Sequence, residues 1–181
     1  MSAGRAGAAR NPYLDDHGEY RPLEMSDAAA ASPTYAAARA SWRAANAKDR
    51  DGWLALWSPD GRIEDPVGPS FLDPTGAGHA GPDGLAEFWA KAVSTPSHIE
   101  FRFDRAVLCG TELLCVGTIR THLGQGADAQ VMDAAGAVVY RVDDAGRMLT
   151  LRAFWEPDVA MTTLRPAATS SSSDPTEPRE A

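Results

Sequence analysis

The stretch AANAKDRDGWLALWSPDGRIEDPVG, residues 44–68, contains the change of periodicity that decides the fold. Its first residues end a helix, and residues 48–52 break the chain. Apolar residues at helical spacing then predict a second short helix over residues 51–61. From Arg62 onward the alternation has a period of two, which is typical of a strand. Pro66 lacks a backbone N–H, so the strand ends there or lies at a sheet edge.

The two acids at the end of this strand face opposite sides. Because alternate side chains of a strand point to opposite faces, Asp65 shares a face with Ile63 and Val67. Glu64 shares the other face with Arg62, which is typical of a solvated surface. A buried carboxylate is rare unless it is paired or functional. Asp65 is therefore either a turn-capping residue or an acid at the mouth of a cavity.

The segments around this stretch predict an α+β fold. Ser32 and Pro33 have the residue types of a helix start, and the first helix runs from there to the break at residue 48. Pro82 lies in the first turn of a third helix, and residues 67–81 form a Gly/Pro loop before it. Strands are predicted over residues 98–109, 112–121, 129–142 and 147–156, with a hairpin turn at 143–146. We expect the helices to pack on one face of a curved sheet and to enclose a cone that can hold a ligand.

Composition separates one domain from two tails. Residues 1–32 lack sustained periodicity and predict a disordered N-terminal arm. Residues 33–164 have the pattern of a single domain, and residues 165–181 form a polar Ser/Pro/Glu tail that we expect to be disordered.

The charge and the absence of special segments exclude several classes of protein. The 181 residues carry a formal net charge of −8, which argues against nucleic acid and against anionic membranes as partners. No apolar run reaches the length of a membrane span, and the N-terminus lacks the apolar core of a signal peptide. A cytoplasmic protein is the simplest interpretation. Cys109 and Cys115 flank a turn and are predicted to be small core residues.

Two patterns that resemble binding motifs are rejected. GAGHAG, residues 76–81, fits the spacing of a dinucleotide-binding loop, but no strand precedes it and no parallel βαβ unit surrounds it. The four histidines are dispersed, so no metal site is predicted, and nothing in the sequence indicates a cofactor. His79 is interpreted as a solvated loop residue near the mouth of the cavity.

Residues 44–68 resemble the ketosteroid isomerase and SnoaL-like branch of the NTF2-like superfamily, and the resemblance extends over residues 35–160. HAGPDGLAEFWAKA is similar to the family's third helix, and VVYRVDDAGRMLTLRAFWEPD to its final hairpin. The resemblance implies an NTF2-like cone, with three N-terminal helices packed on a curved, mostly antiparallel sheet. It also implies a homodimer formed through the sheet and a deep pocket for a small apolar substrate such as a steroid.

The resemblance assigns the general base and leaves its oxyanion donors open. The Asp of EDPVG is the base in the isomerases, which corresponds to Asp65. The family's two donors, a Tyr and a protonated Asp, correspond to Ser41 and Val138. Serine is shorter than tyrosine, valine cannot donate, and loss of one such donor costs roughly 10²–10³ in rate. The candidate replacements are Tyr140, on the same strand face as Val138, and the indole N–H groups of Trp89 and Trp155.

The candidate site then consists of two groups. We expect Asp65, Tyr140 and Ser41 to act in catalysis. The substrate-binding group is Trp57, Trp89, Val138 and Trp155. Residues 69–80 are longer than the equivalent loop of compact isomerases and are a candidate lid.

Three functions remain open at this stage. The first is a steroid Δ-isomerase-like enzyme that moves a double bond by proton transfer through Asp65. The second is an epoxide hydrolase or cyclase of polyketide or terpenoid chemistry, which needs a second acid. Glu100 and Asp133 are the nearest candidates for that acid, and both are expected to be solvated. The third is a domain that binds a small apolar ligand without turnover.

Overall fold

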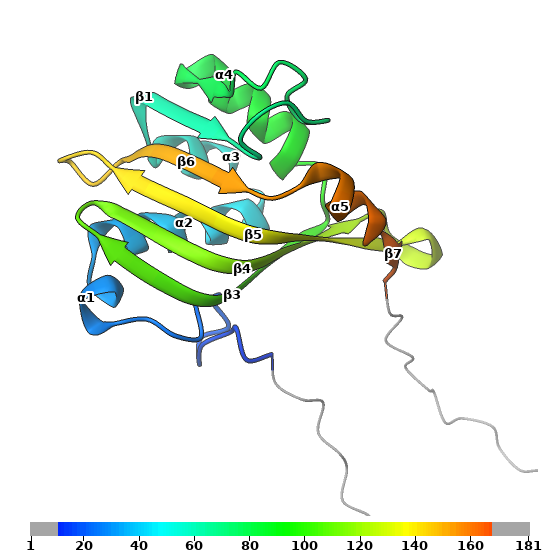
Figure 1. Ribbon diagram of the computed structural model, residues 1–181, viewed down its shortest axis with the longest axis horizontal. Helices are drawn as coiled ribbons and strands as arrows, with labels where there is room; N and C mark the ends of the chain where they lie inside the picture. Colours follow the sequence, from blue (N-terminus) through cyan, green and yellow to red (C-terminus); the bar gives the residue numbers. More distant parts are fainter. Residues whose placement is uncertain (1–10, 168–181) are drawn as a thin grey trace, which may run out of the picture.

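A curved, open sheet carries helices on its concave face in the computed structural model, which describes residues 11–167 (Figure 1). The elements in chain order are α1 (Asp27–Ala30), α2 (Pro33–Ala47), α3 (Arg50–Ala55), β1 (Trp57–Glu64), β2 (His79–Ala80), α4 (Gly81–Phe88), the π-helical turn η1 (Trp89–Val93), β3 (His98–Cys109), β4 (Glu112–Leu123), the 3₁₀ turn η2 (Gly126–Asp128), β5 (Gln130–Val142), β6 (Met148–Phe154), α5 (Pro157–Thr162) and β7 (Arg165–Pro166).

The seven strands form one mostly antiparallel sheet. Its order is β2-β1-β6-β5-β4-β3, and the short β7 pairs with the beginning of β5. The pairing of β1 with β6 is parallel, and the other pairs are antiparallel. Helices α2 and α3 lie behind the long strands, and α4 lies beside β1 (Figure 1). The predicted α+β class, with helices on a curved and mostly antiparallel sheet, is confirmed.

The first long helix begins and ends where its sequence indicates. Ser32 caps α2, because its hydroxyl accepts from the backbone N–H of Tyr35, and Pro33 occupies the first turn. Lys48 ends the helix in the left-handed conformation, with φ of 56°. The face of α2 that is buried against the sheet includes Ala38 and Trp42.

The second helix is shorter than its periodicity predicts. The prediction of a helix over residues 51–61 is wrong beyond Ala55, because α3 ends there and β1 begins at Trp57. The backbone N–H of Met148 donates to the carbonyl of Leu56, and Trp57 pairs with Met148. Pairing with β6 therefore draws these residues into the sheet in spite of their helical spacing.

The structure differs from the predicted N-terminal arm over residues 11–32. The backbone N–H groups of Leu23 and Glu24 donate to carbonyls of Phe103 and Asp104 on the edge strand β3. Tyr20 is buried in the core cluster. Hydrogen bonds to a strand edge need no periodicity, which explains why the composition predicts disorder here. Residues 1–10 lie outside the described part of the chain.

The end of the domain contains two elements that the sequence analysis does not anticipate. Helix α5 has Pro157 in its first turn, which is a recognised start signal, and it buries Ala160. β7 extends into the segment predicted as a tail, and residues 168–181 of that tail lie outside the described residues. Cys115 is buried as predicted, whereas the prediction for Cys109 is wrong, because it ends β3 on the exposed side.

Candidate active site

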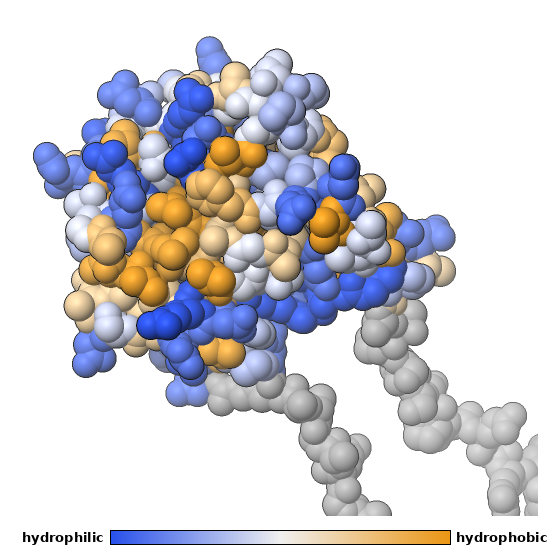
Figure 2. Space-filling model, viewed as in Figure 1, coloured by the Kyte–Doolittle hydropathy of each residue, from blue (hydrophilic) through white to orange (hydrophobic). Residues whose placement is uncertain are grey.

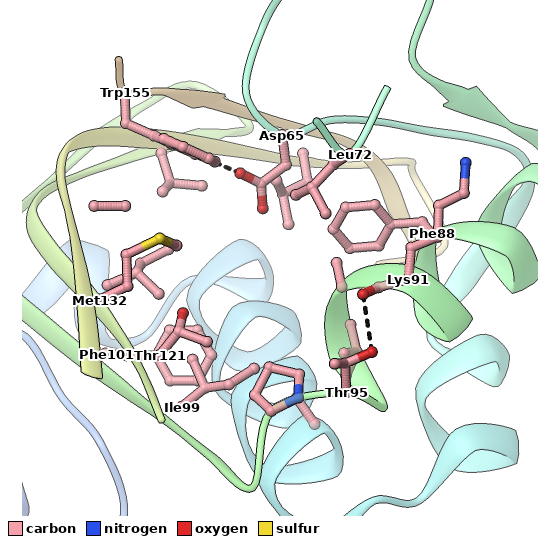
Figure 3. A pocket seen from close by; sticks show the side chains of 18 of the residues that line it. Asp65, Leu72, Phe88, Lys91, Thr95, Ile99, Phe101, Thr121, Met132 and Trp155 are labelled. Carbon is pink, nitrogen blue, oxygen red and sulfur yellow. Dashed lines mark hydrogen bonds between the residues drawn. The ribbon is translucent and has the colours of Figure 1, made fainter. Parts of the chain in front are cut away.

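A cavity of about 330 Å³ lies between the concave face of the sheet and the helices. Its wall is largely apolar, with contributions from Leu151 and from Phe88, Ile99, Phe101 and Met132, which are labelled in Figure 3. The polar side chains in the wall are those of Ser41, Asp65, Lys91, Thr95, Thr121 and Tyr140, with the indole N–H groups of the lining tryptophans. The ammonium group of Lys91 forms an ion pair with Glu87 at 2.6 Å and points away from the cavity in Figure 3.

Asp65 directly follows the last residue of β1 and lines this cavity. Ile63, two residues earlier on the same face, is fully buried, while Glu64 points outward and pairs with Arg152 at 2.7 Å. The indole N–H of Trp155 donates to Asp65 Oδ1 at 2.6 Å (Figure 3). Burial raises the pKa of Asp65, and the hydrogen bond from Trp155 opposes that rise. Asp65 is therefore a stronger base than a solvated aspartate, and its second oxygen has no protein donor among the described residues.

The raised pKa of Asp65 predicts a pH-dependent effect of Asp65→Asn on stability. Because the folded-state pKa lies above the unfolded value of 3.8, the contribution of Asp65 to folding is fully present below that value. It is lost as the pH rises through the folded-state pKa. The variant should therefore match the wild type near pH 3 and exceed its free energy of unfolding at pH 7. Urea unfolding of both proteins across this range measures the difference, and a difference that does not change with pH would contradict the burial of Asp65.

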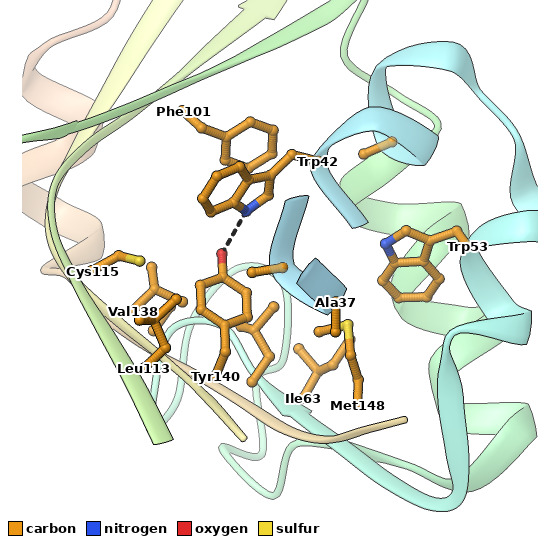
Figure 4. Close-up of a cluster of buried hydrophobic side chains, with 14 of the residues drawn as sticks. Ala37, Trp42, Trp53, Ile63, Phe101, Leu113, Cys115, Val138, Tyr140 and Met148 are labelled. Atoms are coloured by element: carbon orange, nitrogen blue, oxygen red, sulfur yellow. Dashed lines mark hydrogen bonds between the residues drawn. The ribbon is translucent and has the colours of Figure 1, made fainter. Parts of the chain in front are cut away.

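Tyr140 presents a neutral hydroxyl to the same cavity. It lies on β5 and is buried, and the indole N–H of Trp42 donates to its Oη at 2.9 Å (Figure 4). The pKa of Tyr140 is raised well above 10, mainly by burial and less by the nearby Cys115 and Asp65, while the hydrogen bond from Trp42 opposes the rise. The phenol therefore keeps its proton and is available as a hydrogen-bond donor. Tyr140 and Asp65 both line this cavity.

Ser41 is the second buried hydroxyl in the cavity wall. It lies on α2, and its Oγ accepts a hydrogen bond of 3.0 Å from the indole N–H of Trp53. Val138 also lines the cavity, one inward position before Tyr140 on β5. The structure therefore places Asp65, Tyr140, Ser41, Val138 and Trp155 in the wall of one cavity.

Two of the predicted substrate-binding tryptophans do not reach the cavity. Trp57 and Trp89 each pack with a ring-centroid distance of 5.3 Å against Trp53, and it is Trp53 that lines the wall. Trp57 begins β1 and Trp89 begins η1, so their side chains fill the layer behind the wall. The prediction that they contact substrate is not supported by these positions. Trp42 and Trp53 contribute to the wall instead, and helical spacing alone did not distinguish them from core residues.

The loop that follows Asp65 covers one side of the cavity. Phe71 and Leu72 line the wall, and the ring of Phe71 lies 5.9 Å from that of Trp155. Asp73 holds the loop together by accepting hydrogen bonds from the backbone N–H groups of Thr75 and Gly78. A hydrogen bond from the Thr75 hydroxyl, together with these backbone bonds, lowers the pKa of Asp73 to about 2. The segment predicted as a lid is thus internally ordered and carries apolar side chains to the site.

His79, at the end of this loop, is buried, so its interpretation as a solvated residue is wrong. It pairs with Ile63 in the β1–β2 ladder, and its ring lies 5.5 Å from that of Phe88. The loop folds back as strand β2 on β1, which removes the imidazole from water. His79 is not part of the cavity wall.

The acids considered as partners for Asp65 are engaged elsewhere. Glu100 binds His122 and Arg102, each at 2.6 Å, and Asp133 binds Arg120 and Arg165. Within residues 11–167, Asp65 is the sole carboxylate that lines the cavity.

The same part of the chain contains no group of three or more metal-ligating side chains that could hold an ion. None of its helices is long and apolar enough to span a membrane.

Comparisons with known proteins agree with this architecture. The family model of the SnoaL-like domain matches residues 38–151. The Δ5-3-ketosteroid isomerase from Mycobacterium sp. is similar in structure, with a TM-score of 0.64 and 32% identity, over 74% of this chain and 98% of that chain. Rv0760c from Mycobacterium tuberculosis, solved in complex with estradiol-17β-hemisuccinate, has a TM-score of 0.63 and 27% identity over the same shares. An LEH-like epoxide hydrolase from M. tuberculosis has a TM-score of 0.54 and 20% identity, over 72% and 84% of the two chains, and shows the fold alone.

No curated protein matches the chain. The family match covers more than half of the 181 residues, and the fold and cavity agree with it. The protein therefore belongs to the SnoaL-like family of the NTF2-like superfamily, whose fold includes ketosteroid isomerases and epoxide hydrolase/cyclase-like enzymes.

Proposed function

We propose that the protein is an isomerase that moves a carbon–carbon double bond into conjugation with a ketone, in a steroid or a similarly flat, apolar enone. The observation that carries the proposal is the environment of Asp65. This single carboxylate has a raised pKa and lies in an apolar cavity that also contains two buried hydroxyl groups. A base, donors for an oxygen and an apolar wall are the three requirements of this reaction.

The proposed steps use these groups in turn. Asp65 takes a proton from the carbon between the ketone and the double bond, and the electron pair of that C–H bond moves into a dienolate. The negative charge develops on the ketone oxygen, where the hydroxyls of Tyr140 and Ser41 donate hydrogen bonds. The protonated Asp65 then returns its proton to the γ carbon, which leaves the double bond conjugated. Trp155 holds the carboxylate in place and lowers its proton affinity slightly.

The comparisons support the choice of substrate class. One similar structure is a Δ5-3-ketosteroid isomerase, and another was solved with an estradiol derivative. The cavity of about 330 Å³ has few polar groups to bind a hydrophilic ligand. A rigid apolar ring system with one ketone matches a largely apolar wall that has few polar groups.

The test of the proposal is conversion of a Δ5-3-ketosteroid by the wild-type protein, followed by the absorbance of the conjugated enone. We expect enzyme-dependent growth of that absorbance, saturable in substrate. A protein whose tryptophan fluorescence is quenched by the steroid, but which forms no conjugated product, would overturn the proposal. That result would favour binding without turnover.

Epoxide opening is supported less well by the site. That chemistry needs a group that donates a proton while a carboxylate activates water. Glu100 is paired with Arg102 and Asp133 with Arg165, and neither acid lines the cavity, so neither is placed to supply it. Parallel incubation with an apolar epoxide is the matching control, and diol formation without enone isomerisation would favour this alternative.

We also propose that the protein forms a homodimer through the outer face of its sheet. Figure 2 shows apolar side chains gathered over this face, which Figure 1 presents from the same side. Val107, Val116 and Phe154 are exposed there on β3, β4 and β6. Exposed apolar patches with a charged margin are typical of association surfaces.

The dimer proposal predicts a large effect of Val116→Arg. An arginine buried without a partner costs several kcal/mol, so we expect the dimer dissociation constant to rise by more than about 100-fold. Light scattering coupled to gel filtration would measure the change in mass. Ala145→Arg, in the exposed turn between β5 and β6, adds the same charge away from the face and should leave the mass unchanged. A wild-type protein that is monomeric at high concentration would contradict the proposal.

A further inference from the structure

Two buried tryptophans each donate to a hydroxyl group in the cavity wall. The indole N–H of Trp42 donates to Tyr140 Oη at 2.9 Å, and that of Trp53 donates to Ser41 Oγ at 3.0 Å. Both tryptophans are buried, and both hydroxyl residues line the cavity. Figure 4 shows the Trp42–Tyr140 bond, and shows the indole nitrogen of Trp53 directed toward α2.

The indole bonds decide what the two hydroxyls offer to a ligand. An indole N–H is a donor only, so each hydroxyl oxygen serves it as acceptor. Among residues 11–167, no protein acceptor takes the proton of either hydroxyl. Both protons are therefore left for whatever occupies the cavity. A hydroxyl that accepts one hydrogen bond is also a better donor in the next, because neighbouring bonds polarise one another.

We propose that Trp42 and Trp53 are positioning residues that turn Tyr140 and Ser41 into a paired donor site, selective for a ligand oxygen that carries negative charge. The inference rests on the proposed function and adds the device that replaces the donors absent at Ser41 and Val138. It also narrows the ligand class to enolates, phenolates and the ketones that become enolates. A ligand whose polar end can only donate would leave both hydroxyl protons without an acceptor.

The charge selectivity does not come from a cationic side chain in the wall. The ammonium group of Lys91 is paired with Glu87 and turned away from the cavity, so it does not neutralise a bound oxyanion. Asp65 lines the same cavity, and its negative charge opposes a second anion until Asp65 is protonated. The reaction meets this condition, because the dienolate forms when Asp65 has taken its proton.

Trp57 provides a matched control for the two positioning residues. Its indole N–H is buried in the same aromatic cluster, but the structure gives it no hydrogen-bond partner. Trp57→Phe therefore removes a buried indole without removing a bond to a hydroxyl. Trp42→Phe and Trp53→Phe each remove a buried indole together with its hydrogen bond to a hydroxyl.

The experiment measures the ionisation state of bound β-naphthol by its ultraviolet absorbance, in protein that carries Asp65→Asn. This background mimics the protonated base, and tryptophan quenching confirms occupancy. At a pH below the pKa of free naphthol, we expect the bound ligand to be largely ionised. Trp42→Phe and Trp53→Phe should each lower its ratio of ionised to neutral form by about tenfold, because a hydrogen bond to an anion is weakened. Trp57→Phe should leave the ratio unchanged.

The ionisation ratio separates positioning from packing. A loss of packing lowers total affinity for both forms of naphthol, whereas loss of donor alignment changes their ratio. Bound naphthol that remains neutral, naphthol that fails to bind, or equal effects of all three tryptophan substitutions would overturn the inference. Ionised bound naphthol in a protein that does not isomerise enones would overturn the isomerase and leave the donor pair standing. Enone turnover by a protein whose bound naphthol stays neutral would overturn the donor pair and leave the isomerase standing.

Discussion

Asp65→Asn should lower kcat for enone isomerisation by about 10²–10⁴-fold, the usual contribution of a positioned general base. Asparagine has nearly the same shape and can still accept from Trp155, but it cannot take a proton from carbon. Steroid affinity should therefore be retained or increased, since a buried charge is removed. Initial rates from enone absorbance, with affinity from tryptophan quenching, measure both quantities.

Glu64→Gln is the control for this substitution. Glu64 precedes Asp65 in the chain but faces outward and pairs with Arg152. The same chemical change on the outer face should leave kcat within about twofold, because surface substitutions away from special features have small effects. Equal losses in both variants would show that the effect of Asp65→Asn comes from a disturbed strand end, and would contradict its role as base.

Tyr140→Phe should lower kcat by about 10²–10³-fold, the effect expected on removing one preorganised oxyanion donor. The phenylalanine keeps the buried ring, so the hydroxyl proton is the main loss. KM for the ketone should change much less than kcat, because the donor matters most when charge develops on the oxygen. Steady-state kinetics on the same enone substrate separate the two parameters.

Tyr35→Phe provides the comparison, because Tyr35 is buried on α2 but is not part of the cavity wall. It should leave kcat close to the wild-type value. The effect of Tyr140→Phe should also be greater than that of Ser41→Ala, since the shorter serine reaches less far into the cavity. A Tyr140→Phe protein with wild-type kcat would show that another group stabilises the oxyanion.

The position of Asp65 was predictable because it depends on local rules. The two-residue period of a strand separates Asp65 from Glu64, and the structure places Ile63 inside and Glu64 outside, as that period requires. The start of α2 was predictable for the same reason, since Ser32 and Pro33 act within one turn. The strands after residue 98, which form the concave wall, were likewise predictable from their two-residue alternation.

Features that depend on tertiary contacts were not predictable in the same way. Whether Trp53 or Trp57 faces the cavity depends on where α3 stops, and pairing between β1 and β6 sets that point. Residues 11–32 are held by the edge of β3, which no local pattern reveals. The indole bonds to Tyr140 and Ser41 join positions 98 and 12 residues apart. Only the folded arrangement shows that each hydroxyl oxygen accepts from an indole N–H.

The most direct test of the central claim is to follow deuterium placed on the carbon between the ketone and the double bond of a Δ5-3-ketosteroid. If Asp65 carries the proton within a cavity of few polar groups, part of the deuterium should appear at the γ carbon of the conjugated product. Mass spectrometry and proton NMR of the product would locate it, and Asp65→Asn should abolish the transfer. Conjugated product whose γ carbon carries hydrogen from the solvent alone would contradict proton transfer by a single sequestered carboxyl group.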